Sequence, residues 1–145
     1  MSNHFQNPDW EAIDAILTTC RVIAVVGLSD KEDRPSFQVS AAMQDAGYTI
    51  IPINPARESI LGEKCYASLA DVPKDISIDI VNVFRRSEET LSSAEQAVAV
   101  GAKSLWLQQG VYNEESAKIA GDSGLVVIMD RCIKVEHALR GRRRG

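Results

Sequence analysis

The chain has little of what metal, disulfide or membrane chemistry requires. It contains three cysteines, Cys20, Cys65 and Cys132, which lie far apart and without metal-ligand spacing, and only two histidines. Its longest apolar runs are far too short to span a bilayer, and its first residues lack the basic start and apolar core of a secretory signal. We therefore expect no membrane segment and a location in the reducing cytoplasm.

An excess of positive charge is also missing. The net charge of -4 gives no reason to expect nucleic acid as a partner of the whole chain. Only the end, residues 140–145 with the sequence RGRRRG, is locally basic. We interpret these residues as a solvated basic tail, and the alternative is an electrostatic contact with RNA or another anion.

What is present is the composition of one globular domain, with 45% apolar and 25% charged residues in a chain of 145. Strand and helix patterns alternate without a repeat or linker, which is typical of the α/β class. The predicted strands are 22–27, 48–53, 78–84, 104–107 and 125–129. The predicted helices are 10–19 after an Asp9 cap, 35–46, 87–100, 114–120 after an Asn113 cap, and 133–139, with a short helical turn near 68–71.

The predicted strands are near-continuous apolar runs, which is the pattern of strands covered on both faces. We therefore predict a single Rossmann-like domain over residues 1–145, with a five-stranded parallel sheet of order 3-2-1-4-5 and helices on both faces. Residues 1–20 should form an N-terminal helix that packs on this domain. The loops that follow the strands should meet at the carboxyl edge of the sheet, where ligands of such folds bind.

The first of these loops departs from the dinucleotide fingerprint G-x-G-x-x-G. Gly27 occupies the first position, but Ser29 and Glu32 occupy the second and third. The carboxylate that would hold a ribose hydroxyl at the end of the second strand is replaced by Asn54. The sequence therefore disfavours NAD.

The same loops still carry the groups of an anion site. A helix that begins near Pro35 offers backbone N–H groups, and Ser29 and Ser36 offer hydroxyls. Neighbouring loops add five cations, which are Lys31, Arg34, Arg57, Arg85 and Arg86. The alternative is a charge-mixed surface, because Asp30, Glu32 and Asp33 lie in the same loop.

Eight short motifs occur in an order that resembles a known family. They are VVGLS (25–29), RPS (34–36), GY (47–48), PINP (52–55), LG (61–62), VFRRSE (83–88), WLQQGV (106–111) and MDRCIK (129–134). Over residues 22–137 the chain is similar to the small bacterial and archaeal CoA-binding domain proteins. Those are single Rossmann-like domains that resemble the CoA-binding domain of the succinyl-CoA synthetase alpha subunit.

The resemblance implies coenzyme A as the ligand and a site on five loops. The first loop would hold phosphate, the second the adenosine end with its 3'-phosphate, the third would flank adenine and pyrophosphate, and the last two would line the path of the pantetheine arm. The residues that match are, in that order, Gly27, Leu28, Ser29, Arg34 and Ser36; Asn54, Pro55 and Arg57; Val83, Phe84 and Arg85; and Gln108, Gly110, Arg131 and Cys132. The three phosphates of CoA would account for the clustered arginines.

Three functions stay open at this point. The first is a stand-alone CoA or acyl-CoA binding protein without catalytic residues, acting as a sensor, a carrier or the partner of another protein. The second is an enzyme that uses a dinucleotide or a CoA thioester, and the third is an adaptor whose basic tail contacts RNA. We expect no enzyme, because the synthetase's phosphorylated histidine lies in a further domain and neither His4 nor His137 lies in a catalytic motif. Cys132, between Arg131 and Lys134, is either a reactive thiolate or an inert buried cysteine.

Overall fold

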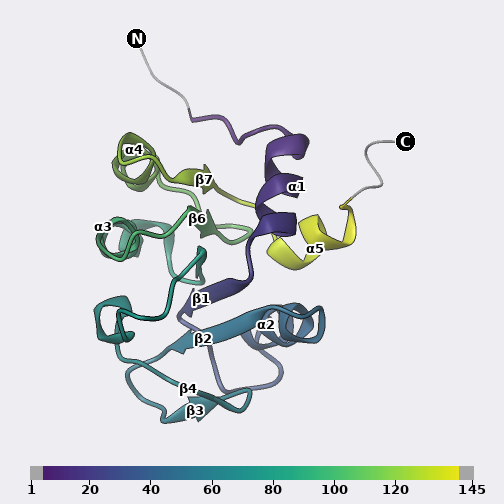
Figure 1. Ribbon diagram of the computed structural model, residues 1–145, viewed down its shortest axis with the longest axis vertical. Coiled ribbons are helices and arrows are strands. Elements are labelled where there is room, and N and C mark those ends of the chain that lie inside the picture. The colour runs from purple at the N-terminus through teal and green to yellow at the C-terminus, as the bar shows by residue number, and fades with distance from the viewer. Residues whose placement is uncertain (1–4, 141–145) are drawn as a thin grey trace.

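Five short parallel strands form the centre of the computed structural model, which describes residues 5–140 (Figure 1). All five are apolar runs, and the middle strands are buried along their whole length. The predicted α/β class with a five-stranded parallel sheet is confirmed. The strands are β1 (Val22–Val26), β2 (Thr49–Ile53), β5 (Ile80–Val83), β6 (Ser104–Leu107) and β7 (Val126–Ile128).

The predicted strand order 3-2-1-4-5 is wrong. The sheet runs β2-β1-β5-β6-β7, so the third strand pairs directly with β1, and β2 lies at the edge. Pro52 in the middle of β2 gives the physical reason, because it has no N–H to donate to a further strand. Its main chain faces away from β1, and its carbonyl accepts a hydrogen bond from the Tyr66 N–H at 3.0 Å. Successive strands are therefore added on one side of β1 up to β2 and on its other side from β5 onward, so the switch point of the sheet lies between β1 and β5.

A small hairpin beside β2 was not predicted from the sequence. Its strands β3 (Ser59–Ile60) and β4 (Glu63–Lys64) pair antiparallel around Leu61 and Gly62 (Figure 1). Both turn residues have positive φ angles, of 55° and 76°, as a tight hairpin turn requires. The predicted helical turn near 68–71 is present as a 3₁₀ turn over Leu69–Asp71.

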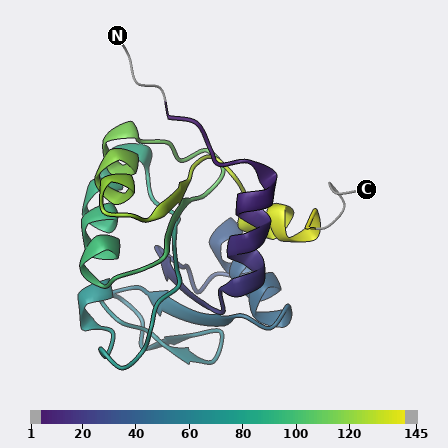
Figure 2. The ribbon, with the colours of Figure 1, turned by 45° about the horizontal axis from the view of Figure 1, so that its top comes forward.

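Helices cover both faces of the sheet (Figure 2). On one face, α1 (Trp10–Thr19), α2 (Pro35–Asp45) and α5 (Ile133–Ala138) bury large side chains such as Leu17 and Met43. On the other face, α3 (Leu91–Ala99) and α4 (Glu114–Asp122) bury alanines, which allows these two helices to lie close to the sheet and to each other. The predicted caps are present, since Asp9 and Asn113 each accept a hydrogen bond from a backbone N–H of the first helical turn.

The edge of the sheet at β7 is held by a residue that precedes α1. The Asn7 side-chain amide donates to the Met129 carbonyl at 2.8 Å and accepts from the Met129 N–H at 2.7 Å, as a neighbouring strand would. Between residues 5 and 140 there is no helix with the length and apolar character needed to cross a membrane. Of the predicted basic tail, Arg140 is described and residues 141–145 lie outside the described residues.

Candidate functional site

The loop after β1 and the loop after β5 touch at Gly27. Gly27 has a φ of +82°, and a Cβ atom there would lie 2.4 Å from the Phe84 carbonyl oxygen. Both the backbone conformation and the lack of space therefore require glycine. This contact lies at the switch point between β1 and β5, which is where ligands of doubly wound sheets bind.

Hydroxyl groups organise the first loop. The Ser36 hydroxyl accepts a hydrogen bond from the Ser29 N–H at 3.0 Å, and the Ser29 hydroxyl accepts one from the Lys31 N–H at 3.1 Å. Helix α2 then begins at Pro35 with no side chain capping its first turn. Its free N–H groups and the positive end of its dipole favour an anion at this position.

A cavity of about 360 Å³ lies in front of this helix start. Arg34 and Lys31 line it, and within residues 5–140 no carboxylate lies within 4.0 Å of either side-chain nitrogen group. The acidic residues of the loop therefore form no direct ion pair with these two cations, although the charge of Lys31 contributes to lowering the pKa of the Asp30 carboxyl. The cavity is lined by Gly27, Ser29, Lys31, Arg34, Pro35, Ser36 and Phe84.

A second cavity, of about 770 Å³, adjoins the first and shares Gly27, Pro35 and Phe84 with it. We call the two together the switch-point trough. The larger cavity is mostly apolar, with Arg85 and Arg86 on one side. Arg85 forms an exposed ion pair with Glu89 at 3.5 Å, whereas no ion pair within residues 5–140 involves Arg86. The remaining lining residues are Val39, Glu89, Gln108, Gln109, Val111 and Cys132.

The second loop supports the first one rather than lining the trough. The Asn54 amide donates to the Leu28 carbonyl at 2.9 Å, and its oxygen accepts from the Ala56 N–H at 2.8 Å. Arg57 forms an ion pair with Asp30 at 2.7 Å, and this hydrogen bond lowers the pKa of the Asp30 carboxyl. Asn54 and Arg57 are therefore occupied by contacts to the first loop, and neither they nor Pro55 line the trough.

The loops after β6 and β7 hold each other. The Asp130 carboxylate accepts a hydrogen bond from the Gly110 N–H at 2.7 Å, and the backbone N–H of Asp130 donates to the Val111 carbonyl. Gln108 is 6% exposed, and its side-chain oxygen accepts from the Ile133 N–H at 3.5 Å. Gln108 and Cys132 line the trough, while the Arg131 side chain is exposed and lies outside it.

The structure thus brings most of the predicted loops to one trough. It also distinguishes the predicted residues that line the trough from those that only support it. Leu28 and Val83 are fully buried and act as packing, and Gly110 shapes its turn. Pro35 and Val39 line the trough but were not assigned as site residues. Their spacing of four residues places them on the same helical face, next to the predicted loop, and this spacing was the available signal.

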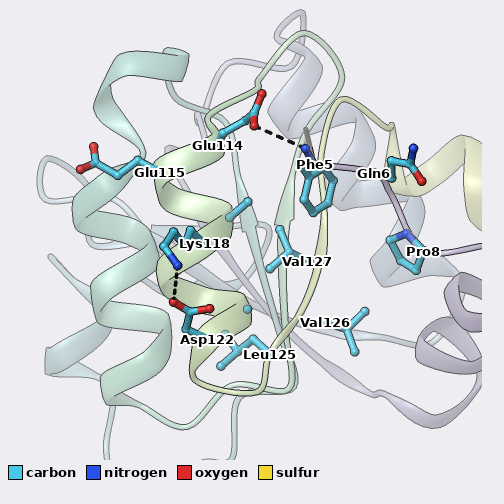
Figure 3. Close-up of a pocket in the computed structure, with 12 residues that line it drawn as sticks. Phe5, Gln6, Pro8, Glu114, Glu115, Lys118, Asp122, Leu125, Val126 and Val127 are labelled. Atoms are coloured by element: carbon cyan, nitrogen blue, oxygen red, sulfur yellow. Dashed lines mark hydrogen bonds and ion pairs between the residues drawn. The ribbon is translucent and has the colours of Figure 1, made fainter. Parts of the chain in front are cut away.

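A larger hollow of about 820 Å³ lies elsewhere, between α4, β7 and the segment that contains Phe5 (Figure 3). It is lined mainly by apolar residues such as Leu125 and Val127, and its one cation, Lys118, is paired with Asp122 at 3.0 Å. Glu114 and Glu115 stand at its rim, so phosphate groups would be repelled. None of the predicted site residues lines this hollow.

Comparison with known proteins relates the chain to a family. Residues 21–138 match the family model described as a CoA binding domain. The chain is 52% identical over 134 residues to "Uncharacterized protein YneT" of Bacillus subtilis (strain 168), which covers 92% of this chain and 98% of that protein. It is 35% identical to a solved structure titled "hypothetical protein from Pyrococcus horikoshii OT3", with a TM-score of 0.88, covering 96% of this chain and 99% of that one.

Larger proteins match over a short part of their length. The chain is 33% identical over 99 residues to "Acetate--CoA ligase [ADP-forming] II" of Archaeoglobus fulgidus, which covers 66% of this chain but only 14% of the ligase.

Proposed function

The chain belongs to the CoA-binding domain family, and from this premise we propose that it binds coenzyme A or an acyl-CoA in the switch-point trough. The observation that carries the proposal is the pairing of two adjoining cavities. The smaller one is lined by Lys31 and Arg34 at the start of α2, and the larger one is mostly apolar beside Arg85 and Arg86. CoA has the same division, with a phosphorylated nucleotide at one end and a pantetheine arm at the other.

The cationic cavity suits the phosphates of CoA. Lys31 and Arg34 have no carboxylate partner within residues 5–140, and the uncapped start of α2 adds backbone N–H donors. The Ser36 hydroxyl accepts from Ser29, so its own proton stays available for a phosphate oxygen. Gly27 has no side chain of its own, so its backbone can approach a ligand closely beside the Arg85 side chain.

The larger cavity suits the pantetheine arm. Val39, Phe84 and Val111 give it apolar walls, and the half-buried Cys132 lies among its lining residues. Gln108 is buried here, and its amide nitrogen can donate to an amide oxygen of pantetheine. An acyl group at the thiol would extend along the same apolar wall.

We further propose that the chain acts as a binding protein rather than a ligase on its own. Within residues 5–140, the only histidine is His137, and it lines a hollow at the opposite edge of the sheet. Among the described residues, neither cavity of the trough is therefore lined by a histidine that could carry a phosphoryl group as the synthetase histidine does. A sensor, a carrier and a partner of another protein are all consistent with binding alone.

Isothermal titration with CoA, dephospho-CoA and NAD at fixed salt tests the binding proposal. We expect CoA to bind more tightly than NAD, because the residue at the end of β2 is Asn54, whose amide already donates to the Leu28 carbonyl and offers no carboxylate to a ribose diol. Tighter binding of NAD than of CoA would overturn the assignment. Dephospho-CoA measures how much of the affinity comes from the 3'-phosphate.

A further inference from the structure

A separate hollow of about 420 Å³ lies at the amino edge of the sheet, opposite the switch-point trough. Arg21 directly precedes β1 and Tyr48 directly precedes β2, whereas the trough lies beyond the other ends of these strands. His137 of α5 and Arg140, which follows the end of this helix, close the hollow. We call it the amino-edge hollow, and its remaining lining residues are Ala46 and Gly47.

The two arginines of this hollow come from different elements and have no acidic partner. Within residues 5–140 no carboxylate lies within 4.0 Å of Arg21 or Arg140. The Arg21 Nη1 donates to the carbonyls of Thr18 and Cys20, at 3.1 and 2.9 Å, which fixes the guanidinium at the wall. Its Nε and Nη2 make no hydrogen bond within residues 5–140, so they are available to a ligand.

Tyr48 and His137 form the wall between the arginines. Their rings meet edge to face, with centroids 5.6 Å apart, and the Tyr48 hydroxyl donates to the Leu17 carbonyl. Burial raises the pKa of Tyr48, while the charges of Arg140 and Arg21, which line the same hollow, act in the opposite direction. Burial and the charge of Arg140 lower the pKa of His137.

The negative ends of three helices offset part of the positive charge of the two arginines. The carboxyl ends of α1, α2 and α5 all lie next to the lining residues, and each contributes about half a negative charge. Two guanidinium groups therefore exceed the three helix ends by about half a unit, and a protonated His137 adds one more. Asp45, the last residue of α2, is exposed and does not line the hollow.

We propose that the amino-edge hollow binds the phosphate group of a small phosphorylated molecule. Two guanidinium groups from different elements fit a tetrahedral dianion, which offers oxygens in several directions, better than a planar carboxylate. The volume exceeds that of a phosphate group, so it leaves room for an organic part. The site is independent of the trough and binds its ligand whether or not CoA is present.

The test measures the titration of His137 by NMR, because the trough also attracts anions and a local signal is needed. The His137→Gln variant assigns the signal against His4. Sulfate serves as the first probe, since it remains a dianion while histidine titrates, and potassium chloride of equal ionic strength is the reference. We expect sulfate to raise the pKa of His137 by about one unit, which equals a tenfold tighter binding to the imidazolium form.

Variants and a second probe decide the site and the ligand class. Arg21→Gln and Arg140→Gln should each abolish the sulfate effect, whereas Lys118→Gln, on α4 at the other face, should preserve it. Glycerol phosphate should shift the His137 signal at concentrations at least tenfold below those of inorganic phosphate, and saturating CoA should not remove the shift. An unchanged pKa in sulfate, loss of the effect with CoA, or binding of an oligoribonucleotide without binding of glycerol phosphate would each overturn the proposal.

Discussion

Replacement of Arg34 by alanine is the most direct test of the phosphate end of the trough. The Arg34 side chain is exposed and has no carboxylate partner within residues 5–140, so its guanidinium is ready to bind phosphate. A hydrogen bond to a charged group contributes roughly 1.5–3 kcal/mol. Because Arg34 is exposed, we take the lower end, which predicts about tenfold weaker CoA binding in Arg34→Ala.

Titration calorimetry at fixed salt measures this change, with Arg131→Ala as the matched control. Arg131 is also an exposed arginine after a sheet strand, but its side chain lies outside both cavities. We expect the control to bind CoA within about twofold of the wild type, which corresponds to less than 0.5 kcal/mol. Both variants keep their backbone hydrogen bonds, so thermal unfolding should be unchanged. Normal CoA binding by a folded Arg34→Ala protein would refute the phosphate assignment.

Four further outcomes are expected. Asn54→Asp should weaken CoA binding more than NAD binding, because a carboxylate cannot donate to the Leu28 carbonyl that positions the first loop, and it adds a negative charge near the phosphate end; calorimetry with both ligands checks this. Incubation with CoA disulfide should give a mixed disulfide at Cys132 with release of one CoA thiol, and intact mass spectrometry should find no adduct in Cys132→Ser. The purified chain should form no CoA thioester from ATP, acetate and CoA, and product detected by chromatography would contradict the proposal that it acts by binding alone. Burial alone would raise the pKa of Asp79, but hydrogen bonds from two backbone N–H groups and from the Lys103 ammonium outweigh burial and lower the pKa. The ionised Asp79 therefore stabilises the fold above its ordinary pKa of 3.8, and this stabilisation is lost as pH falls through the lower pKa of the folded state. Asp79→Asn should therefore reduce the loss of stability at acid pH, measured by urea unfolding curves over a pH series.

The sequence predicted the elements of the fold better than their arrangement. Apolar runs and the caps at Asp9 and Asn113 are local signals, and the strands and helices they predict are present. The strand order depends on which strand lies at the edge of the sheet. The only indication in the sequence that we identify is Pro52, whose missing N–H favours an edge position for β2. The hairpin β3–β4 has only two residues in each strand, too few for a periodic pattern.

The candidate site shows the same division. Its loops were predicted because the carboxyl ends of parallel strands meet at one edge, and this holds whatever the strand order. The pattern did not reveal which polar side chains are free. Asn54 and Arg57 have the residue types of ligand contacts, but each is paired with the first loop across more than 20 residues of sequence. Such long-range pairs leave no periodic trace in the chain.

The amide of Asn7 has a consequence for the behaviour of the protein in concentrated solution. An exposed sheet edge is a template onto which strands of other molecules add, and such growth leads to aggregates. Asn7 occupies the main-chain groups of Met129 at one edge. At the other edge Pro52 lacks a donor, and Tyr66, which follows the hairpin, pairs with the end of β2. Each end of the sheet is thus partly closed to intermolecular growth by a side chain or a proline, without the cost of a further strand.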